Sequence, residues 1–243
     1  MQIRYLYFFI ALLFCGCSER HGQVCFCFDD DYVDEWYAER ALFQKYDIHA
    51  TFFITRPSQL SQAQIRKLKA LERDGHEIAC HGMHHQNALG YTDSADIYFQ
   101  NEVLAASEQM KKIGFDVQSF AYPFGAHFAA LDSLISKQFL HIRLATYNME
   151  NQPLDKIDRV FASHDSKPPH IQDAMGLDVN YHISPADFET AIKRCNEQGE
   201  TLVCYNHRIN ESGEDYTVSA AYLETLFKLC QKHRVKSMRF KSL

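Results

Sequence analysis

The chain has 243 residues, a length that fits one large α/β domain or two small ones. Its apolar fraction of 46% is typical of a packed globular protein and argues against intrinsic disorder. The net charge is −6 with neutral histidines, and no basic run appears, so nothing in the charge pattern favours a nucleic acid as partner.

The first residues are predicted to be an export signal. Residues 1–4 carry a positive charge, and residues 5–14 form an apolar run that is too short to span a bilayer. Gly16 and Cys17 then resemble the processing site of bacterial lipoproteins, where the cysteine is lipidated and becomes the mature N-terminus. We therefore expect a lipoprotein-type signal peptide over residues 1–17 and one folded domain over residues 18–243. The expected location is the bacterial periplasm or cell surface, with a lipid anchor on Cys17; an ordinary cleaved secretory peptide is the alternative.

After this signal, short β-like runs alternate with amphipathic helices. Strands are predicted at residues 24–28, 49–55, 76–80, 119–122, 141–145, 159–162, 201–205 and 235–240. Helices are predicted at residues 61–74, 93–113, 131–138, 184–198 and 219–233. Residues 163–182 hold two prolines, several polar residues and no period, which indicates a long surface loop.

Repeated strand–helix units predict a single α/β domain with a parallel sheet. The economical form is a (β/α) barrel, closed or nearly closed, irregular or incomplete, with seven to eight strands. A doubly wound open sheet is the alternative.

Two of the eight cysteines belong to the signal, and the others are scattered without C-x-x-C spacing. A cysteine-type zinc site therefore has little support, and buried thiols are expected. Cys25 and Cys27 alternate along a predicted strand, so both point to one face and are poorly placed to bond each other. A disulfide elsewhere stays open as an alternative in an oxidising compartment.

Polar clusters follow three predicted strands. They are residues 29–31, which are all aspartate, residues 81–85 with three histidines, and His207. A fourth segment, residues 121–125, also follows a strand. Because the carboxyl ends of parallel strands meet at one edge of the sheet, these segments are expected to converge on a site.

The residue types in two of these clusters indicate a metal. His81 and His85 are four apart and can face one ion on a helical turn, although paired surface histidines are the alternative and His84 is a rival ligand. Three adjacent carboxylates repel one another unless something offsets their charge; a solvated acidic turn is the alternative to a metal. Two histidines with one carboxylate leave positions open for water, as in hydrolytic zinc sites, and leave a second aspartate free as a base.

In order and spacing, these segments resemble the polysaccharide deacetylases of carbohydrate esterase family 4, from about Val24 to the C-terminus. The family's first motif, T-F-D-D-G, is similar to residues 27–31 and implies that Asp29 is the catalytic base and Asp30 a metal ligand. Its second, H-[ST]-x-x-H, is similar to residues 81–85 and implies that His81 and His85 are the other ligands. Its third, R-x-P-Y-G, is similar to residues 121–125, and its fifth, an apolar strand ending at a histidine, to residues 202–207.

The resemblance implies a metal-dependent hydrolase that removes N-acetyl groups from a glycan and releases acetate. The expected cofactor is Zn²⁺, with Co²⁺ or Ni²⁺ as alternatives. Asp29 would take a proton from the attacking water, the backbone N–H of Phe124 would stabilise the oxyanion, and His207 would protonate the departing amine. The implied partners are an N-acetylated glycan and, through the lipid anchor, the membrane.

The sequence departs from the family's motifs at several positions, including Gly82 in place of the Ser/Thr of the second motif. The third-motif arginine, which pairs with the base aspartate in the family, is Ala121. Arg159 is predicted to replace it from a neighbouring strand, and a surface position for Arg159 is the alternative. The fourth motif, D-x-x-D-W, supplies an aspartate that orients the acid histidine. Residues 155–159 resemble it, but the tryptophan is absent. The glycine of the first motif is Asp31.

Aromatic rings stack on pyranose faces, so Tyr122 and Tyr91 are predicted to bind substrate. Trp36 and Tyr37 are further candidates for which packing is an equally good explanation. Two other functions stay open. One is a carbohydrate-binding protein with impaired catalysis, given Ala121, and the other is a deacetylase or amide hydrolase for a small non-sugar substrate.

Overall fold

The structure is a computed structural model that describes residues 21–146, 152–163 and 167–243. The predicted signal peptide, with Cys15 and Cys17, lies outside the described residues. Within the described ranges, no helix combines the length and the apolar character that a membrane span requires.

Seven parallel strands form a closed barrel. Their order is β1, β2, β3, β4, β5, β7 and β8, and β8 pairs back onto β1. These strands are β1 (Gln23–Asp30), β2 (Thr51–Ile54), β3 (Glu77–Cys80), β4 (Ser119–Ala121), β5 (His141–Thr146), β7 (His170–Gly176) and β8 (Glu200–Asn206). The predicted (β/α) barrel is confirmed, and the open doubly wound sheet is excluded.

In the described part of the chain, four short strands lie outside this ring. β11 (Lys236–Ser237) adds to β1 in parallel, and β6 (Phe161–Ser163) adds to β8 antiparallel. β9 (Arg208–Ile209) and β10 (Thr217–Val218) form a separate two-stranded sheet directly after β8. This small sheet shapes the chain at the carboxyl end of β8, where His207 lies.

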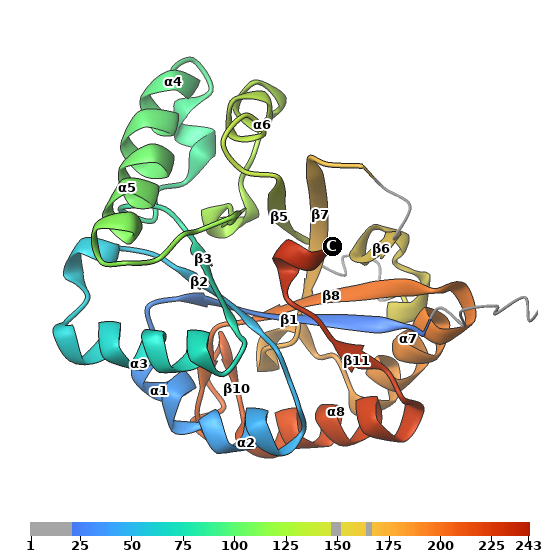
Figure 1. The fold of residues 1–243 in the computed structure, drawn as a ribbon. Coiled ribbons are helices and arrows are strands. Elements are labelled where there is room, and N and C mark those ends of the chain that lie inside the picture. Colours follow the sequence, from blue (N-terminus) through green and yellow to red (C-terminus); the bar gives the residue numbers. More distant parts are fainter. Residues whose placement is uncertain (1–20, 147–151, 164–166) are drawn as a thin grey trace, which may run out of the picture.

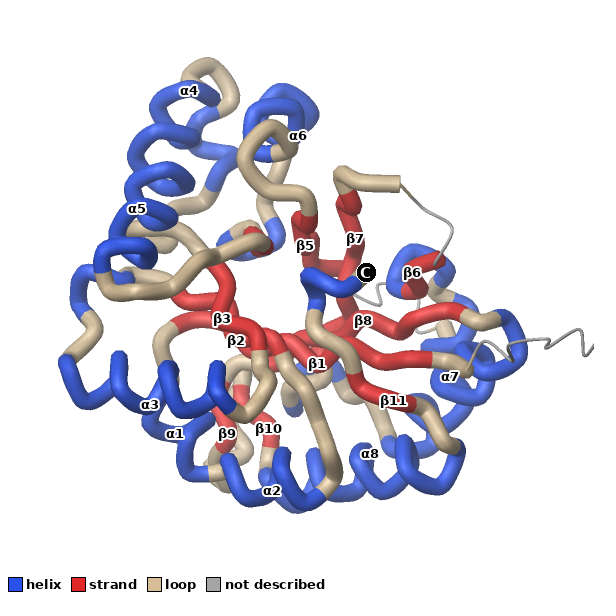
Figure 2. Tube along the Cα trace, in the orientation of Figure 1, coloured by secondary structure: helices blue, strands red, loops and turns tan. Residues whose placement is uncertain are grey.

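Helices surround the ring of strands, as Figures 1 and 2 show. They are α1 (Val33–Ala38), α2 (Arg40–Lys45), α3 (Gln62–Arg73), α4 (Ala95–Tyr98), α5 (Ala105–Lys112), α6 (Ala129–Ile135), α7 (Pro185–Gln198) and α8 (Ala220–His233). The single helix predicted over residues 93–113 is one helical run in which a π-helical segment, Phe99–Leu104, joins α4 to α5. Ser61 and Ser184 cap α3 and α7 in capping boxes, which explains why the starts of these two helices were readable from sequence.

The alternation of side chains in β1 separates two apolar layers. Cys25 and Cys27 belong to the cluster inside the barrel, whereas Phe26 and Phe28 pack between the barrel and the helices. All six cysteines in the described part of the chain are buried and free. They act as small apolar side chains, as predicted.

The long surface loop predicted over residues 163–182 is wrong, because it contains the barrel strand β7. This strand pairs with β5 from His170 to Met175 and with β8 at Met175 and Gly176. Its first half carries polar, partly exposed residues such as Gln172 and Asp173, so it shows no apolar run. Pairing on both edges, which a sequence pattern does not reveal, makes it a strand.

Candidate metal and catalytic site

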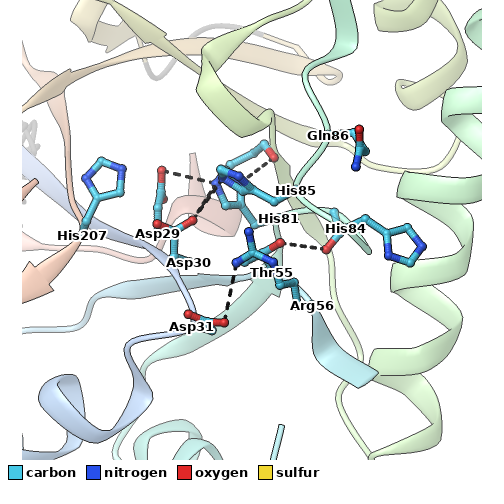
Figure 3. Close-up of polar contacts among 12 residues, drawn as sticks. Asp29, Asp30, Asp31, Thr55, Arg56, His81, His84, His85, Gln86 and His207 are labelled. Carbon is cyan, nitrogen blue, oxygen red and sulfur yellow. Dashed lines mark hydrogen bonds and ion pairs between the residues drawn. The ribbon is translucent and has the colours of Figure 1, made fainter. Parts of the chain in front are cut away.

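Asp30, His81 and His85 come together at the carboxyl end of the barrel. Asp30 pairs with Ile54 of β2, which pairs with Cys80 of β3, so Asp30 and His81 end strands two positions apart in the ring. His85 Nε2 lies 3.1 Å and His81 Nε2 3.8 Å from Asp30 Oδ1. The three ligand atoms lie within 4.8 Å of one another, and Figure 3 shows the side chains facing each other.

These three residues fit a divalent cation. The Nδ1 atom of His81 lies 2.9 Å from the carbonyl oxygen of Ala121, to which it can donate, so that Nε2 presents its lone pair to the cluster. Oδ1 of Asp30 is buried and accepts no hydrogen bond from the described residues. Burial lowers the pKa of His81 to about 4. Although burial alone would raise the pKa of Asp30, the neighbouring imidazoles of His85, His81 and His207 lower it to about 2. A neutral imidazole and an ionised carboxylate are the forms that bind metal, so this set of two nitrogen ligands and one oxygen ligand suits a divalent metal ion.

The loop that carries His85 is held from outside the site. The buried carboxylate of Glu102 accepts the backbone N–H groups of His84 and Gln86, at 3.0 and 3.3 Å. A Cβ atom on Gly82 would come within 2.8 Å of the Glu102 carboxylate, so this position of the second motif requires glycine here. The ring of His84 is exposed and turned away from the cluster, which removes it as a rival ligand (Figure 3).

Asp29 and Asp31 have different surroundings although both neighbour Asp30. Asp29 is buried, and its Oδ1 accepts no hydrogen bond from the described residues, so this oxygen is available to take a proton. Asp31 points toward Arg56, 3.7 Å away, on the side away from His81 (Figure 3). The structure therefore leaves Asp29 as the carboxylate in position to act as base.

Arg143 supplies the cation that the third motif lacks. Its guanidinium is fully enclosed in the barrel and donates to Oδ2 of Asp29. In the β4–β5 register, Arg143 lies directly opposite Ala121. Paired residues of parallel strands point to the same face of the sheet. The side chain of Arg143 therefore enters the barrel from β5 at the same height as a side chain at position 121 would enter it from β4. The rings of Phe53 and Tyr205 flank the guanidinium, with centroids 5.2 and 4.8 Å from its carbon, and help to offset its burial.

The predicted pairing of Arg159 with Asp29 is wrong. Arg159 lies in a 3₁₀ turn, Asp158–Val160, before the short strand β6, and its guanidinium donates to the Thr146 hydroxyl at 3.0 Å. Because β6 runs beside β8 outside the seven-stranded ring, Arg159 does not reach the barrel interior where Asp29 lies.

Arg143→Met is expected to lower kcat/KM across its whole pH profile while the metal content stays at the wild-type level. The guanidinium donates to Oδ2 of Asp29 and holds that carboxylate in place, and methionine removes this hydrogen bond while leaving the metal ligands intact. The matched control is Arg159→Met, which should keep the wild-type profile. If both variants behave as wild type, the contact of Arg143 with Asp29 has no role in the reaction.

His207 is held at three points. Its ring Nδ1 lies 2.6 Å from the buried carboxylate of Asp178, and its backbone N–H donates to the same carboxylate at 3.1 Å. Its backbone carbonyl accepts a hydrogen bond from Trp36 Nε1 at 2.7 Å. Burial by itself lowers the pKa of His207, but the hydrogen bond and charge of Asp178 outweigh it and raise the pKa. The Asp178 carboxylate thus favours the protonated form of His207 and orients its ring, as a general acid requires.

The resemblance of residues 155–159 to the fourth motif therefore does not identify the aspartate that orients His207. Asp155 and Asp158 lie in 3₁₀ turns outside the ring, and Asp158 pairs with Arg194. Asp178, two residues after β7, takes the orienting position. The sequence analysis does not predict this role of Asp178 because it does not predict β7. The signal in the sequence is the apolar run of residues 174–177, which is followed by an aspartate.

Asp178→Asn is expected to move the basic limb of the same pH profile to lower pH. His207 donates only while protonated, and loss of the Asp178 charge lowers its pKa, so activity is lost at a lower pH than in wild type. The expected loss of kcat is on the order of 10²-fold. Asp155→Asn and Asp158→Asn serve as controls and should show the wild-type profile. An unchanged basic limb in Asp178→Asn would contradict the pairing.

The aromatic side chains of the cavity differ from those predicted. Tyr122 lines the cavity but is buried, and its hydroxyl donates to Asp132 at 2.7 Å. Tyr91 packs edge-on against Tyr98 instead of lining the cavity, and Trp36 belongs to the core. The aromatic residues that line the cavity besides Tyr122 are Tyr32, Phe124, Tyr181, Tyr205 and Tyr216.

Phe124 lies at the mouth of the cavity in a left-handed backbone conformation, with φ of 60°. Its ring packs against His85 at 4.6 Å between centroids. Asp30 and His85 have positive φ as well, 86° and 60°. Such conformations cost energy in non-glycine residues and gather at functional sites, so this clustering supports the cavity as the site.

Comparisons with solved structures agree with the fold. A chitin deacetylase from the fungal pathogen Colletotrichum lindemuthianum is 14% identical, with a TM-score of 0.62 over 91% of this chain and 87% of that chain. The Xyl-CE4 domain of a multidomain xylanase from the hindgut metagenome of Trinervitermes trinervoides is 14% identical, with a TM-score of 0.59 over 91% and 89%. A CE4 family pseudoenzyme from Bacillus anthracis is 14% identical, with a TM-score of 0.60 over 93% and 66%.

Among curated proteins, none matches this sequence. The family model described as polysaccharide deacetylase matches residues 18–139, which is half of the chain and includes the residues of the first three motifs. With this match, the closed barrel and the placement of those motifs at its carboxyl end, the chain belongs to the polysaccharide deacetylase family.

Proposed function

We propose that this protein is a metal-dependent deacetylase that removes N-acetyl groups from a glycan and releases acetate. The observation that carries the proposal is that one candidate metal-ligand set and two paired side chains meet at one cavity. These are the ligand set of Asp30, His81 and His85, the Asp29–Arg143 pair, and the His207–Asp178 pair.

The chemistry divides between the two flanks of the ligand set. A divalent cation bound there supplies a Lewis acid that lowers the pKa of water and polarises a carbonyl. Asp29, held by Arg143, accepts the proton of the attacking water at its free Oδ1. The backbone N–H of Phe124 donates to the developing oxyanion. His207, on the opposite side of Asp29 from His81, donates its proton to the departing amine (Figure 3).

Two alternatives are less well supported. Impaired catalysis was inferred from Ala121, but Arg143 provides the missing cation at the same level of the barrel. A small non-sugar substrate would need no aromatic walls, whereas the cavity is lined by tyrosines and by Phe124, which suit the apolar faces of sugar rings. Zn²⁺ is the proposed metal.

The proposal is tested by acetate release from N-acetylated substrates, namely chitooligosaccharides, peptidoglycan glycan strands and small acetamides, before and after addition of Zn²⁺. We expect release from at least one glycan, dependent on metal and abolished in His81→Ala. Glycan binding without acetate release would favour the carbohydrate-binding alternative. Release from small acetamides alone would favour the non-sugar alternative.

We also propose that the protein is exported and anchored by a lipid on Cys17, on the basis of the sequence pattern of residues 1–17. Cys17→Ala is expected to move the protein from the membrane fraction to the soluble fraction of the producing bacterium, because the lipid is the proposed anchor. Cell fractionation with immunodetection measures this. Membrane association that persists in Cys17→Ala would contradict the lipid anchor.

A further inference from the structure

Tyr216 lies at the mouth of the cavity, beside the proposed acid. It is in the segment between β9 and β10, its side chain lines the cavity, and 51% of the residue is exposed. Its ring lies 5.1 Å from the ring of His207, nearly perpendicular at 77°. An aromatic ring that is half open to solvent gains little from burial, so packing does not explain its position.

The backbone of Tyr216 is strained and pinned. Its φ is 59°, in the left-handed region that aromatic residues rarely adopt. Its N–H donates to the Asn180 side chain at 2.9 Å, and its carbonyl accepts from the N–H of Arg208 at 3.2 Å. The chain therefore holds a costly conformation whose visible effect is to present this ring at the cavity.

The same strain recurs around the cavity. Eight non-glycine residues in the described part of the chain have positive φ, and four of them line it: Asp30, His85, Phe124 and Tyr216. The first two belong to the ligand set and Phe124 carries the proposed oxyanion donor. Tyr216 is the one residue of these four that has no role in the proposed reaction.

The position of His207 indicates what the ring contacts. His207 donates to the departing nitrogen, and in an acetamido sugar this nitrogen is bonded directly to the pyranose ring. That pyranose must lie next to His207, and hence next to Tyr216. The C–H groups on one face of a pyranose carry partial positive charge and match the negative face of an aromatic ring.

Resting on the proposed function, we propose that Tyr216 is the stacking platform for the pyranose ring that carries the scissile acetamide. It makes the enzyme select sugars over acetamides that lack a ring. The hydroxyl has no part in this contact, so phenylalanine should replace tyrosine without loss.

The test compares four variants by thermal unfolding and by steady-state kinetics on N-acetylchitotetraose with Zn²⁺. Tyr216→Gly removes both the strain and the ring, so Tm should rise by about 2–4 °C while kcat/KM falls about tenfold through a higher KM. Tyr216→Ala keeps a Cβ atom and should show the same kinetic loss without the gain in Tm. Tyr216→Phe should keep wild-type kinetics.

Arg234→Gly is the matched control. Arg234 is exposed, ends α8 and has φ of 58°, so glycine should raise Tm there with no kinetic change. A wild-type KM in Tyr216→Gly would overturn the platform while leaving the proposed function intact, because wild type still releases acetate. If Tm and kcat/KM both fall in Tyr216→Gly, Tyr216 has a structural role, and the platform is overturned as well. If wild type releases no acetate from any glycan, the proposed function and this inference fail together.

Discussion

Asp30→Ala, His81→Ala and His85→Ala are each expected to abolish stoichiometric metal binding and, with it, acetate release. The three ligand atoms lie within 4.8 Å of one another, and no fourth acidic, histidine or cysteine side chain in the described residues joins the group. Removing one of three protein ligands leaves two, too few for a hydrolytic zinc site. Elemental analysis of dialysed protein measures the metal directly.

His84→Ala is the matched control for these variants. His84 lies between the two ligand histidines in sequence, but its ring faces away from the cluster and only its backbone N–H is used, by Glu102. Alanine keeps that N–H, so metal content should equal that of wild type. Loss of metal in His84→Ala with retention in His85→Ala would show that the ligand assignment is out of register.

Asp29→Asn is expected to retain the metal and to lower kcat by about 10²–10⁴-fold, the usual contribution of general acid–base catalysis. Asparagine keeps the shape of the side chain but cannot take a proton from water. The same samples, assayed for metal content and for acetate release, separate loss of the base from loss of the ligand set.

Asp31→Asn provides the comparison for the base. Asp31 points toward Arg56 outside the cluster, so its replacement should leave turnover near the wild-type value. High activity in Asp29→Asn together with low activity in Asp31→Asn would transfer the role of base to Asp31.

Local patterns predicted most of the fold because local chemistry decides those elements. The capping boxes at Ser61 and Ser184 and the continuous apolar run of β1 are visible in short windows. β7 was not predicted because its stability comes from two neighbouring strands distant in sequence. The closure of the ring by β1 and β8 likewise depends on pairing across the whole chain.

The residues expected at the metal were readable because two short motifs follow strands that the sequence also predicts. Arg143 and Asp178, the residues that pair with Asp29 and His207, could not be predicted from the sequence. Arg143 replaces an arginine from the adjacent strand, a relation that exists only in the β4–β5 register; its one visible signal is a lone arginine between Ile142 and Leu144. Asp178 depends on β7, so an error in the fold became an error in the site.

The account is tested most directly by titrating metal-free protein with Zn²⁺ while acetate release from an N-acetylated chitooligosaccharide is measured. The arrangement of one ligand set per chain, with a base and an acid on its two sides, predicts no activity without metal. Activity should then rise linearly with added Zn²⁺ and level off at one ion per chain. Full activity in the chelated protein, or no response to any added divalent metal, would contradict a metal-dependent deacetylase built on Asp30, His81 and His85.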